Sequence, residues 1–248
     1  MKAIILCAGY GKRLYPYTKN YQKTMVPVNG KPLLEYIIDG LIYAGIKDFI
    51  LVIGYRKEQI MNYFHDGTKW KINISYVEQP VLNGTGGALL LCESLIKNEH
   101  FLLSWGDILF DYSVYKDIIE IYHCESQNFI LTTNYTDDPH LGAAVYIKES
   151  YLENIIEKPA IGTSESNLNN AGLFILSKQI FDTLKSVKPS LRGEIELPDA
   201  LLIGIKKKNW KVRVLEMNKN QFRGDFGNRK EYDRLKRDKS WLQFLNFK

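Results

Sequence analysis

Short apolar runs alternate with amphipathic stretches along the N-terminal part of the chain. The apolar runs are rich in Ile, Leu and Val, a composition typical of strands buried on both faces of a parallel sheet. These runs are Lys2–Cys7, Asp48–Ile53, Ile72–Val77 and Phe101–Trp105. The amphipathic stretches between them predict helices at Pro32–Ala44, Arg56–His65 and Gly86–Ile96. This order of strands and helices predicts an α/β fold with a parallel sheet covered by helices.

The C-terminal half continues the alternation less regularly. Its predicted strands are Phe129–Tyr135, Ala143–Ile147, Gly172–Leu176 and Val212–Glu216, and its predicted helix is Glu196–Lys207. No internal repeat, low-complexity segment or linker interrupts the chain. We therefore predict a single domain over residues 1–248, with one lobe over about 1–110, a second over about 111–228, and a basic amphipathic C-terminal helix over 229–248.

The composition is that of an ordinary globular domain. Hydrophobic residues make up 45% and charged residues 25% of the 248 residues, so a sizeable core is expected. No apolar run approaches the ~20 residues that a membrane helix needs. The N-terminal apolar run is too short for a signal peptide and is interrupted by Gly9 and Gly11. We therefore expect a cytoplasmic protein with no membrane partner.

The positive charge is concentrated at the C-terminus. Of the net charge of +5, residues 229–248 carry +4, from seven Lys or Arg against three acids, which leaves +1 for the rest of the chain. A nucleic-acid-binding protein usually has a broad basic surface, so we expect no nucleic-acid partner. The apolar side chains of this tail predict packing on the domain or on a second subunit, which leaves a homo-oligomer open. They are Trp241, Leu242, Phe244, Leu245 and Phe247.

The segment CAGYGKRLYP, residues 7–16, follows the first predicted strand. In parallel sheets, ligands bind beyond the carboxyl ends of the strands, where this segment lies. It matches neither the dinucleotide fingerprint nor the P-loop. Gly9 and Gly11 nevertheless allow backbone amides to approach an oxyanion. Arg13 can grip a phosphate with its bidentate fork, and Lys23 supplies a further cation. Local chemistry alone supports two interpretations equally. One is a phosphate site, and the other is a tight turn with solvated basic residues.

Several segments in a fixed order carry a resemblance to one enzyme family. They are GYGKRLYPYT, QKTMVPVNGKPLLEY, KWKINISYVEQP, NGTGGAL, SWGD, IIEKP, NNAG, PSLRGEIEL and RGDFGN. In this order they are similar to the motifs of the sugar-1-phosphate nucleotidyltransferases, also called sugar-nucleotide pyrophosphorylases. They look closest to the glucose-1-phosphate thymidylyltransferase and uridylyltransferase branch. The resemblance implies a three-layer α/β/α Rossmann-like nucleotide-diphospho-sugar transferase fold with a mixed, mostly parallel central sheet. It also implies that the first lobe binds the nucleotide and the second the sugar phosphate.

The reaction implied by the resemblance converts a nucleoside triphosphate and a sugar 1-phosphate into a nucleotide sugar and pyrophosphate, with Mg²⁺ as cofactor. The branch implies dTTP or UTP with glucose 1-phosphate, as in nucleotide-sugar and polysaccharide biosynthesis. The attacking phosphate is already anionic near neutral pH, since the second pKa of a phosphate monoester is about 6, so no general base is required. The enzyme must instead neutralise and align two anions, which explains a site of cations and glycines.

The resemblance also implies roles for individual residues. Arg13 on the β- and γ-phosphates and Lys23 near the α-phosphate are the implied catalytic residues. Asp107 and Asp225 are the implied Mg²⁺ ligands. The other implied nucleotide-binding residues are Ala8, Gly9, Gly11, Gln79, Gly84 and Thr85, with the Gln79 amide on the edge of a pyrimidine. The implied sugar-phosphate-binding residues are Gly142, Glu157, Lys158, Asn170 and Arg192. Without the resemblance, each of these could be an ordinary surface or turn residue, and the two aspartates alone favour that interpretation over a metal site.

The chain departs from the family pattern at several positions. Lys12 stands where the family often has threonine, and Gln22 where a proline often precedes the lysine. NGTGGAL is more similar to uridylyl- and guanylyltransferases than to thymidylyltransferases, so the base stays open. The alternatives are a guanylyl- or cytidylyltransferase acting on another sugar phosphate, and a non-catalytic regulatory relative that binds nucleotide sugars. A degraded site would lack charged residues that are all present here, namely Arg13, Lys23, Asp107 and Asp225.

Overall fold

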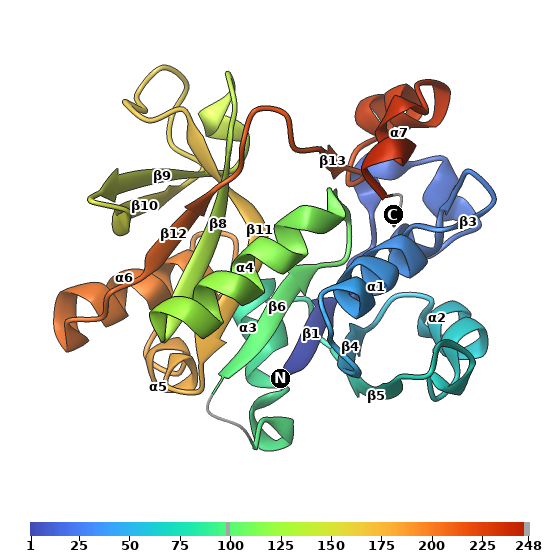
Figure 1. Ribbon diagram of the computed structural model, residues 1–248, viewed down its shortest axis with the longest axis horizontal. Coiled ribbons are helices and arrows are strands. Elements are labelled where there is room, and N and C mark those ends of the chain that lie inside the picture. The colour runs from blue at the N-terminus through green and yellow to red at the C-terminus, as the bar shows by residue number, and fades with distance from the viewer. Residues whose placement is uncertain (98–99, 246–248) are drawn as a thin grey trace. The chain divides into compact units, whose positions relative to one another are not determined.

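The first strands of the chain pair in parallel, as their apolar composition predicts. In the computed structural model, which describes residues 1–97 and 100–245, these strands are β1 (Lys2–Leu6), β4 (Asp48–Ile53) and β5 (Asn73–Glu78). They lie in the order β5-β4-β1 (Figure 1). The segments between them contain α1 (Leu33–Tyr43) and α2 (Lys57–Phe64). The carboxyl ends of the three strands therefore lie at one edge.

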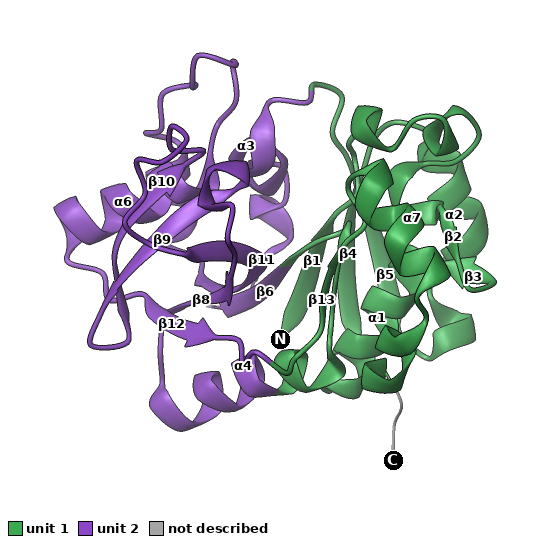
Figure 2. Cartoon of the chain, turned by 90° about the horizontal axis from the view of Figure 1, so that it is seen from above, with its two compact units in different colours: residues 1–81, 104–116, 220–248 green, residues 82–103, 117–219 purple. Residues whose placement is uncertain are grey.

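Contacts within the chain divide it into two compact units (Figure 2). Unit 1 comprises residues 1–81, 104–116 and 220–248, and unit 2 comprises residues 82–103 and 117–219. The units interleave along the chain, whereas the sequence predicts contiguous lobes. Two elements cross the division, namely β6 (His100–Trp105) and α4 (Tyr112–Glu125).

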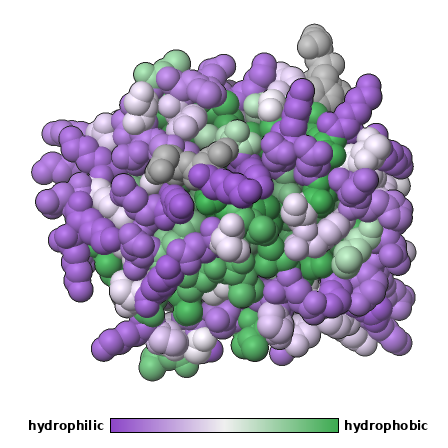
Figure 3. Space-filling view, turned by 90° about the horizontal axis from the view of Figure 1, so that it is seen from below, coloured by the Kyte–Doolittle hydropathy of each residue, from purple (hydrophilic) through white to green (hydrophobic). Residues whose placement is uncertain are grey.

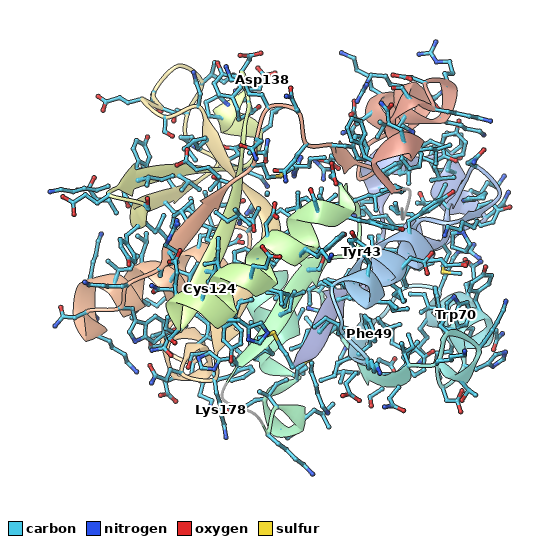
Figure 4. All side chains as sticks on the ribbon, in the orientation of Figure 1. Tyr43, Phe49, Trp70, Cys124, Asp138 and Lys178 are labelled. Atoms are coloured by element: carbon cyan, nitrogen blue, oxygen red, sulfur yellow. The ribbon has the colours of Figure 1, made fainter. Side chains whose placement is uncertain are left out.

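Apart from the three parallel strands and their helices, unit 1 consists of short elements. Its remaining strands form two antiparallel pairs, β2 (Pro27–Val28) with β3 (Lys31–Pro32) and β7 (Ile108–Phe110) with β13 (Arg223–Asp225). Its other helices are the 3-10 helices η1 (Lys12–Leu14), η2 (Tyr17–Lys19), η3 (Lys23–Met25), η4 (Thr68–Trp70) and η7 (Ser240–Leu245), and the α-helix α7 (Arg229–Arg237). The core includes β4, whose Phe49, labelled in Figure 4, is 2% exposed.

Unit 2 combines antiparallel and parallel strands. Its strands are β8 (Phe129–Tyr135), β9 (Ala143–Lys148), β10 (Tyr151–Glu157), β11 (Leu168–Ser177) and β12 (Arg213–Glu216). β8 is antiparallel to β11 and parallel to β12. β10 is antiparallel to both β9 and β12. Its helices are α3 (Gly84–Leu90), η5 (Glu93–Leu95), η6 (Pro139–Leu141), α5 (Ile180–Leu184) and α6 (Leu197–Lys208). The predicted α/β class and mixed sheet are confirmed, and the pairs β8–β11, β9–β10 and β10–β12 of unit 2 are antiparallel.

The hydrophobic pattern predicts most strands and helices but not all of them. The predictions Asp48–Ile53 and Phe129–Tyr135 coincide with β4 and β8. The predicted helix Gly86–Ile96 is wrong in its second half, where the chain leaves α3 after Leu90 and forms η5. The pattern also misses α4 and β10. The start of α4 has a local signal, because Asp111 Oδ1 accepts the N–H of Ser113 at 2.9 Å as an N-cap does.

The C-terminal segment forms two helices where the sequence predicts one. After α7 ends at Arg237, Asp238 is extended, with φ −85° and ψ 108°, and η7 follows. Trp241 is 2% exposed and its Nε1 donates to the backbone oxygen of Leu235 at 2.8 Å. Its ring stacks on that of Phe222, with 5.6 Å between the centroids. The tail therefore packs on unit 1 of its own chain. Phe247 lies outside the described residues.

Polar side chains dominate the periphery of the face shown in Figure 3, and apolar side chains gather toward its centre. None of the helices formed by residues 1–97 and 100–245 combines the length and the apolar character needed to cross a membrane.

The buried tail predicts that Trp241→Ala lowers the free energy of unfolding by about 3–5 kcal/mol, since it leaves a large cavity in unit 1. Urea unfolding measures this loss. Gln243→Ala is the matched control, because Gln243 is exposed on the same 3-10 helix, and it should change stability by no more than about 0.5 kcal/mol. Equal stability of both variants would contradict the packing of the tail.

Candidate active site

The loop after β1 combines a tight turn with an open approach to the backbone. Gly11 has φ +65°, and a Cβ there would lie 2.8 Å from Thr18 Cγ2 and 2.9 Å from Lys23 Cβ, so only glycine fits. Gly9 is exposed, and a Cβ at Gly9 would meet no atom within 4 Å. Ala8 is buried and its backbone oxygen accepts the N–H of Tyr55 at 3.1 Å. The loop is thus fixed at Ala8 and Gly11 and leaves free space beside Gly9.

Three charged side chains converge next to this loop. Lys23 Nζ forms an ion pair with Asp107 Oδ2, and the two side chains are 17% and 19% exposed. A Cβ at Gly227 would lie 2.6 Å from Asp107 Oδ2, 2.7 Å from Asp225 Oδ1 and 3.2 Å from Lys23 Nζ. The predicted catalytic lysine and the two predicted metal ligands therefore all border the space that a side chain at Gly227 would enter.

Strand pairing brings the two aspartates together from distant parts of the chain. Asp107 directly precedes β7 and Asp225 ends β13, and these strands pair with Asp225 opposite Ile108. The N–H of Phe226 donates to the backbone oxygen of Asp107 at 2.9 Å. The N–H of Gly227 donates to Asp225 Oδ1 at 2.7 Å, which orients this carboxylate.

The two carboxylates have opposite pKa shifts. Burial acts to raise the pKa of Asp107, but the charge and hydrogen bond of Lys23, with a smaller effect from Arg13, hold it below its ordinary value. The pKa of Asp225 is raised, because burial and the negative charge of Asp107 outweigh the opposing influence of Arg223. Asp225 therefore takes up a proton before Asp107 as the pH falls.

The donor set fits a metal ion that is shared with a phosphate ligand. Within residues 1–97 and 100–245, no group of three or more His, Cys, Asp or Glu side chains could hold a metal ion. Asp107 and Asp225 are only a pair, and one oxygen of Asp107 already faces Lys23. Mg²⁺ is commonly held by one or two carboxylates, substrate phosphates and water. The arrangement is therefore suited to an ion that arrives with a nucleotide rather than to a protein cage.

The predicted base-binding residues fall into different units. Gln79 belongs to unit 1, is 6% exposed and follows β5, and its N–H donates to Ile53 O at 2.8 Å. Gly84 and Thr85 belong to unit 2. Gly84 has φ +96°, and a Cβ there would lie 2.6 Å from the backbone oxygen of Ile195. Packing on this backbone therefore requires glycine at position 84 whether or not a base binds there.

Several predicted sugar-phosphate residues lie together in unit 2. Glu157 ends β10 opposite Ala143 of β9, and the N–H of Lys158 donates to Gly142 O at 2.9 Å. Asn170, on β11, is 3% exposed, and its Oδ1 accepts the N–H of Gly172 at 3.0 Å. Its Nδ2 is buried and makes no hydrogen bond to any residue that the structure describes. This unused donor suits a ligand hydroxyl or a water molecule.

Arg192 is surrounded by carboxylates, which the motif alone does not reveal. Its Nη2 lies 2.5 Å from Glu196 Oε1, 3.1 Å from Glu194 Oε2 and 3.7 Å from Glu157 Oε1. The pKa of Glu157 is raised by its burial and by the charge of Glu196. The guanidinium is thus neutralised, which favours a bracing role for Arg192 over a direct hold on phosphate. The signal that sequence reasoning missed is the pair of glutamates two and four residues after Arg192.

The glycine geometry predicts that one alanine substitution lowers the stability of the protein and that another does not. Gly84→Ala should lower the free energy of unfolding by about 1–3 kcal/mol, because alanine is strained at this positive φ and meets the Ile195 backbone. Gly9→Ala is the control and should leave stability unchanged, since its methyl group enters empty space. Chemical unfolding of both variants tests the pair, and a stable Gly84→Ala variant would contradict the packing argument.

Sequence comparison relates the chain to one family over nearly its whole length. The model of the family described as nucleotidyl transferase matches residues 2–240. The bifunctional protein GlmU of Methanococcus maripaludis strain C7 is 39% identical over 218 residues, which are 88% of this chain and 50% of the relative. A putative UTP–glucose-1-phosphate uridylyltransferase of Methanocaldococcus jannaschii is 30% identical, over 84% of this chain and 83% of the relative. The chain thus spans about half the length of the bifunctional relatives that it matches.

Solved structures share the fold. UDP-glucose pyrophosphorylase in complex with UDP-glucose is 27% identical, with a TM-score of 0.85 over 95% of this chain and 97% of that chain. A putative glucose-1-phosphate thymidylyltransferase from Bacillus anthracis, in complex with sucrose, is 24% identical, with a TM-score of 0.85 over 100% and 96%. The second likeness concerns the fold alone. Together they confirm the predicted fold class.

Proposed function

The chain belongs to the nucleotidyl transferase family, and we propose that it transfers a nucleotidyl group from dTTP or UTP to glucose 1-phosphate, giving a nucleotide sugar and pyrophosphate. The observation that carries the proposal is the convergence of Lys23, Asp107 and Asp225 around Gly227, next to the Gly9 loop. A relative named as a putative UTP–glucose-1-phosphate uridylyltransferase supports the choice of substrates. We also propose that the reaction takes place in the cytoplasm.

The proposed reaction is an in-line displacement at the α-phosphorus. A phosphate oxygen of the sugar 1-phosphate forms a bond to the α-phosphorus, and the bond from the α-phosphorus to the bridging oxygen of the β-phosphate breaks. Pyrophosphate leaves with that electron pair. The nucleophile is already anionic, so the side chains have only to offset and align charge.

The cations of unit 1 have separate tasks in this proposal. Lys23 neutralises charge at the α-phosphate, and Arg13, which is exposed on η1, holds the β- and γ-phosphates. The space beside Gly9 lets the backbone amides of the loop approach the phosphate oxygens. Mg²⁺ bound by Asp107 and Asp225 would add charge neutralisation on the phosphates. Gln79 of unit 1 would read the pyrimidine edge. Gly84 and Thr85 of unit 2 are further proposed nucleotide-binding residues.

The acceptor would be held by residues of unit 2. The Glu157 carboxylate accepts hydrogen bonds from sugar hydroxyls, and the Lys158 ammonium, whose side chain is 51% exposed, meets the sugar phosphate. The unused Nδ2 of Asn170 and the backbone of Gly142 complete the proposed set. Arg192, whose Nη2 lies 3.7 Å from Glu157 Oε1, would hold this carboxylate in place.

A homo-oligomeric contact through the tail is a separate proposal. Trp241 is buried in its own chain, so a contact with a second subunit would use the exposed side of η7. Light scattering of the full chain and of a chain ending at residue 239 tests it. Equal oligomeric mass of the two chains contradicts a contact through the tail.

The first test of the activity is pyrophosphate release from glucose 1-phosphate and Mg²⁺, with dTTP, UTP, CTP, GTP and ATP offered separately. Release with dTTP or UTP alone is expected. Lys23→Ala should lower kcat about 10²–10³-fold, as removal of a charge-stabilising donor does in other enzymes. Lys188→Ala, an exposed lysine of unit 2, is the control and should retain full activity. Release only with GTP or CTP would contradict the proposed choice of dTTP or UTP. A fully active Lys23→Ala variant would contradict the catalytic role of Lys23.

The raised pKa of Asp225 predicts a metal affinity that depends on pH. As the pH falls through the pKa of Asp225, its carboxylate protonates and can no longer bind Mg²⁺, while Asp107 remains ionised. The apparent affinity for Mg²⁺ should therefore weaken on the acidic side of neutrality. Calorimetric titration of Mg²⁺ into the protein with a non-hydrolysable nucleotide, without acceptor, measures it.

The Asp225→Asn variant serves as the reference for this titration. It should bind Mg²⁺ weakly at every pH and lose the acid-dependent step. A wild-type affinity that is the same at acidic and neutral pH would argue against Asp225 as a ligand.

A further inference from the structure

Gln22, the residue before the proposed catalytic lysine, is completely buried. Its exposed fraction is 0%, although glutamine is mostly found at protein surfaces. A buried amide is tolerated only where its donor and acceptor atoms are paired, because an unpaired polar atom inside a protein is costly. The partners of Gln22 therefore show what this side chain holds in place.

The Gln22 amide joins the end of β1 to the turn that carries Lys23. Its Nε2 donates to the backbone oxygen of Cys7, the residue after β1. Its Oε1 accepts two hydrogen bonds from Thr24, from the backbone N–H at 2.6 Å and from Oγ1 at 2.7 Å. The Gln22 side chain is thus the N-cap of η3, the 3-10 helix that begins with Lys23.

A second glutamine fixes the backbone on the other side. The N–H of Gln22 donates to Gln59 Oε1 at 2.6 Å, and Gln59 Nε2 donates to Asn20 O at 2.8 Å. Gln59 lies on α2, so the segment before Lys23 is tied to a helix as well as to the end of β1. These bonds account for the position of the backbone on both sides of Gln22.

The neighbour on the far side of Lys23 is also enclosed. Thr24 is 2% exposed, and its Cγ2 would lie 3.0 Å from a Cβ at Gly106, the residue before Asp107. Lys23 is therefore flanked by two buried residues, one bonded to β1 and one packed beside Gly106. Its own side chain is directed to Asp107, with which it forms the ion pair.

We propose that Gln22 is a positioning residue, which holds the ammonium of Lys23 against Asp107 and in line with the proposed α-phosphate. This inference rests on the proposed function for its effect on rate, but its structural part concerns Lys23 and Asp107 alone. A misplacement of a reacting or charge-stabilising group by about 1 Å can cost about 10²-fold in rate. The buried amide would prevent that misplacement.

The kinetic test uses Gln22→Met, which keeps the length of the side chain and removes its hydrogen bonds. We expect kcat to fall about 10–10²-fold, with KM for the nucleotide changed less. Gln59→Leu removes the acceptor for the Gln22 N–H and the donor to Asn20 O, but keeps the side-chain hydrogen bonds of Gln22. It should cause a smaller loss in the same direction, and it keeps the test available if Gln22→Met does not fold. Gln179→Ala is the control, since Gln179 is exposed and makes no side-chain cap at the start of α5.

A double-mutant cycle separates positioning from general destabilisation. If Gln22 acts through Lys23, Gln22→Met should cost nothing further in a Lys23→Ala background. If the two losses instead multiply, the positioning role is overturned.

A readout independent of turnover is the NMR signal of Lys23 after reductive methylation with ¹³C-formaldehyde, assigned by its absence in Lys23→Ala. In the wild type the chemical shift of the Lys23 signal should differ from the shifts of exposed lysines, because of the ion pair with Asp107. In folded Gln22→Met or Gln59→Leu, the Lys23 shift should move toward the shifts of exposed lysines. An unchanged signal in both folded variants overturns the inference. If the wild-type protein releases no pyrophosphate with any nucleotide, the proposed function fails, and the NMR result alone decides on Gln22.

Discussion

The ion pair between Lys23 and Asp107 is the interaction on which the rest of the site depends. Both side chains are largely shielded from water, so the separation of either from its partner would leave a poorly solvated charge. The ammonium keeps Asp107 ionised although burial opposes its charge. Asp225 is itself buried, and this burial together with the negative charge of Asp107 raises its pKa. The ion pair thus keeps Asp107 charged and, through that charge, contributes to the raised pKa of Asp225, the second carboxylate proposed to hold the metal.

Local charge balance also distinguishes two arginines that the motifs present as similar phosphate ligands. Arg13 is exposed on η1 and close enough to Asp107 to lower the pKa of that carboxyl, and its fork is accessible to a triphosphate. Arg192 has three carboxylates within 4 Å, from Glu157, Glu194 and Glu196. A guanidinium so surrounded offers little positive potential to a phosphate, but it can hold Glu157 in one orientation. The two residues therefore serve different ends of the proposed reaction.

Elements with a strong local pattern were predictable, and those that depend on distant contacts were not. β4 and β8 match their predictions because a buried strand is apolar on both faces. The C-terminal tail was predicted as one helix because its basic and apolar positions suit one. The chain instead turns at Asp238, so that Trp241 can pack on Phe222. Gln22 had no visible role in the sequence, since its partners Cys7 and Gln59 come from separate elements.

The sequence by itself determined the α/β class, the order of the motifs and the chemical types at the site, because periodicity and residue chemistry are local properties. It also placed Gly9, Gly11 and Arg13 just beyond a buried strand. Only the tertiary structure decided that Asp107 and Asp225 meet, through the pairing of β7 with β13, and that the charge of Arg192 is neutralised. The physical reason is that charge interactions and the pairing of buried polar atoms depend on distance and burial, which long-range contacts set.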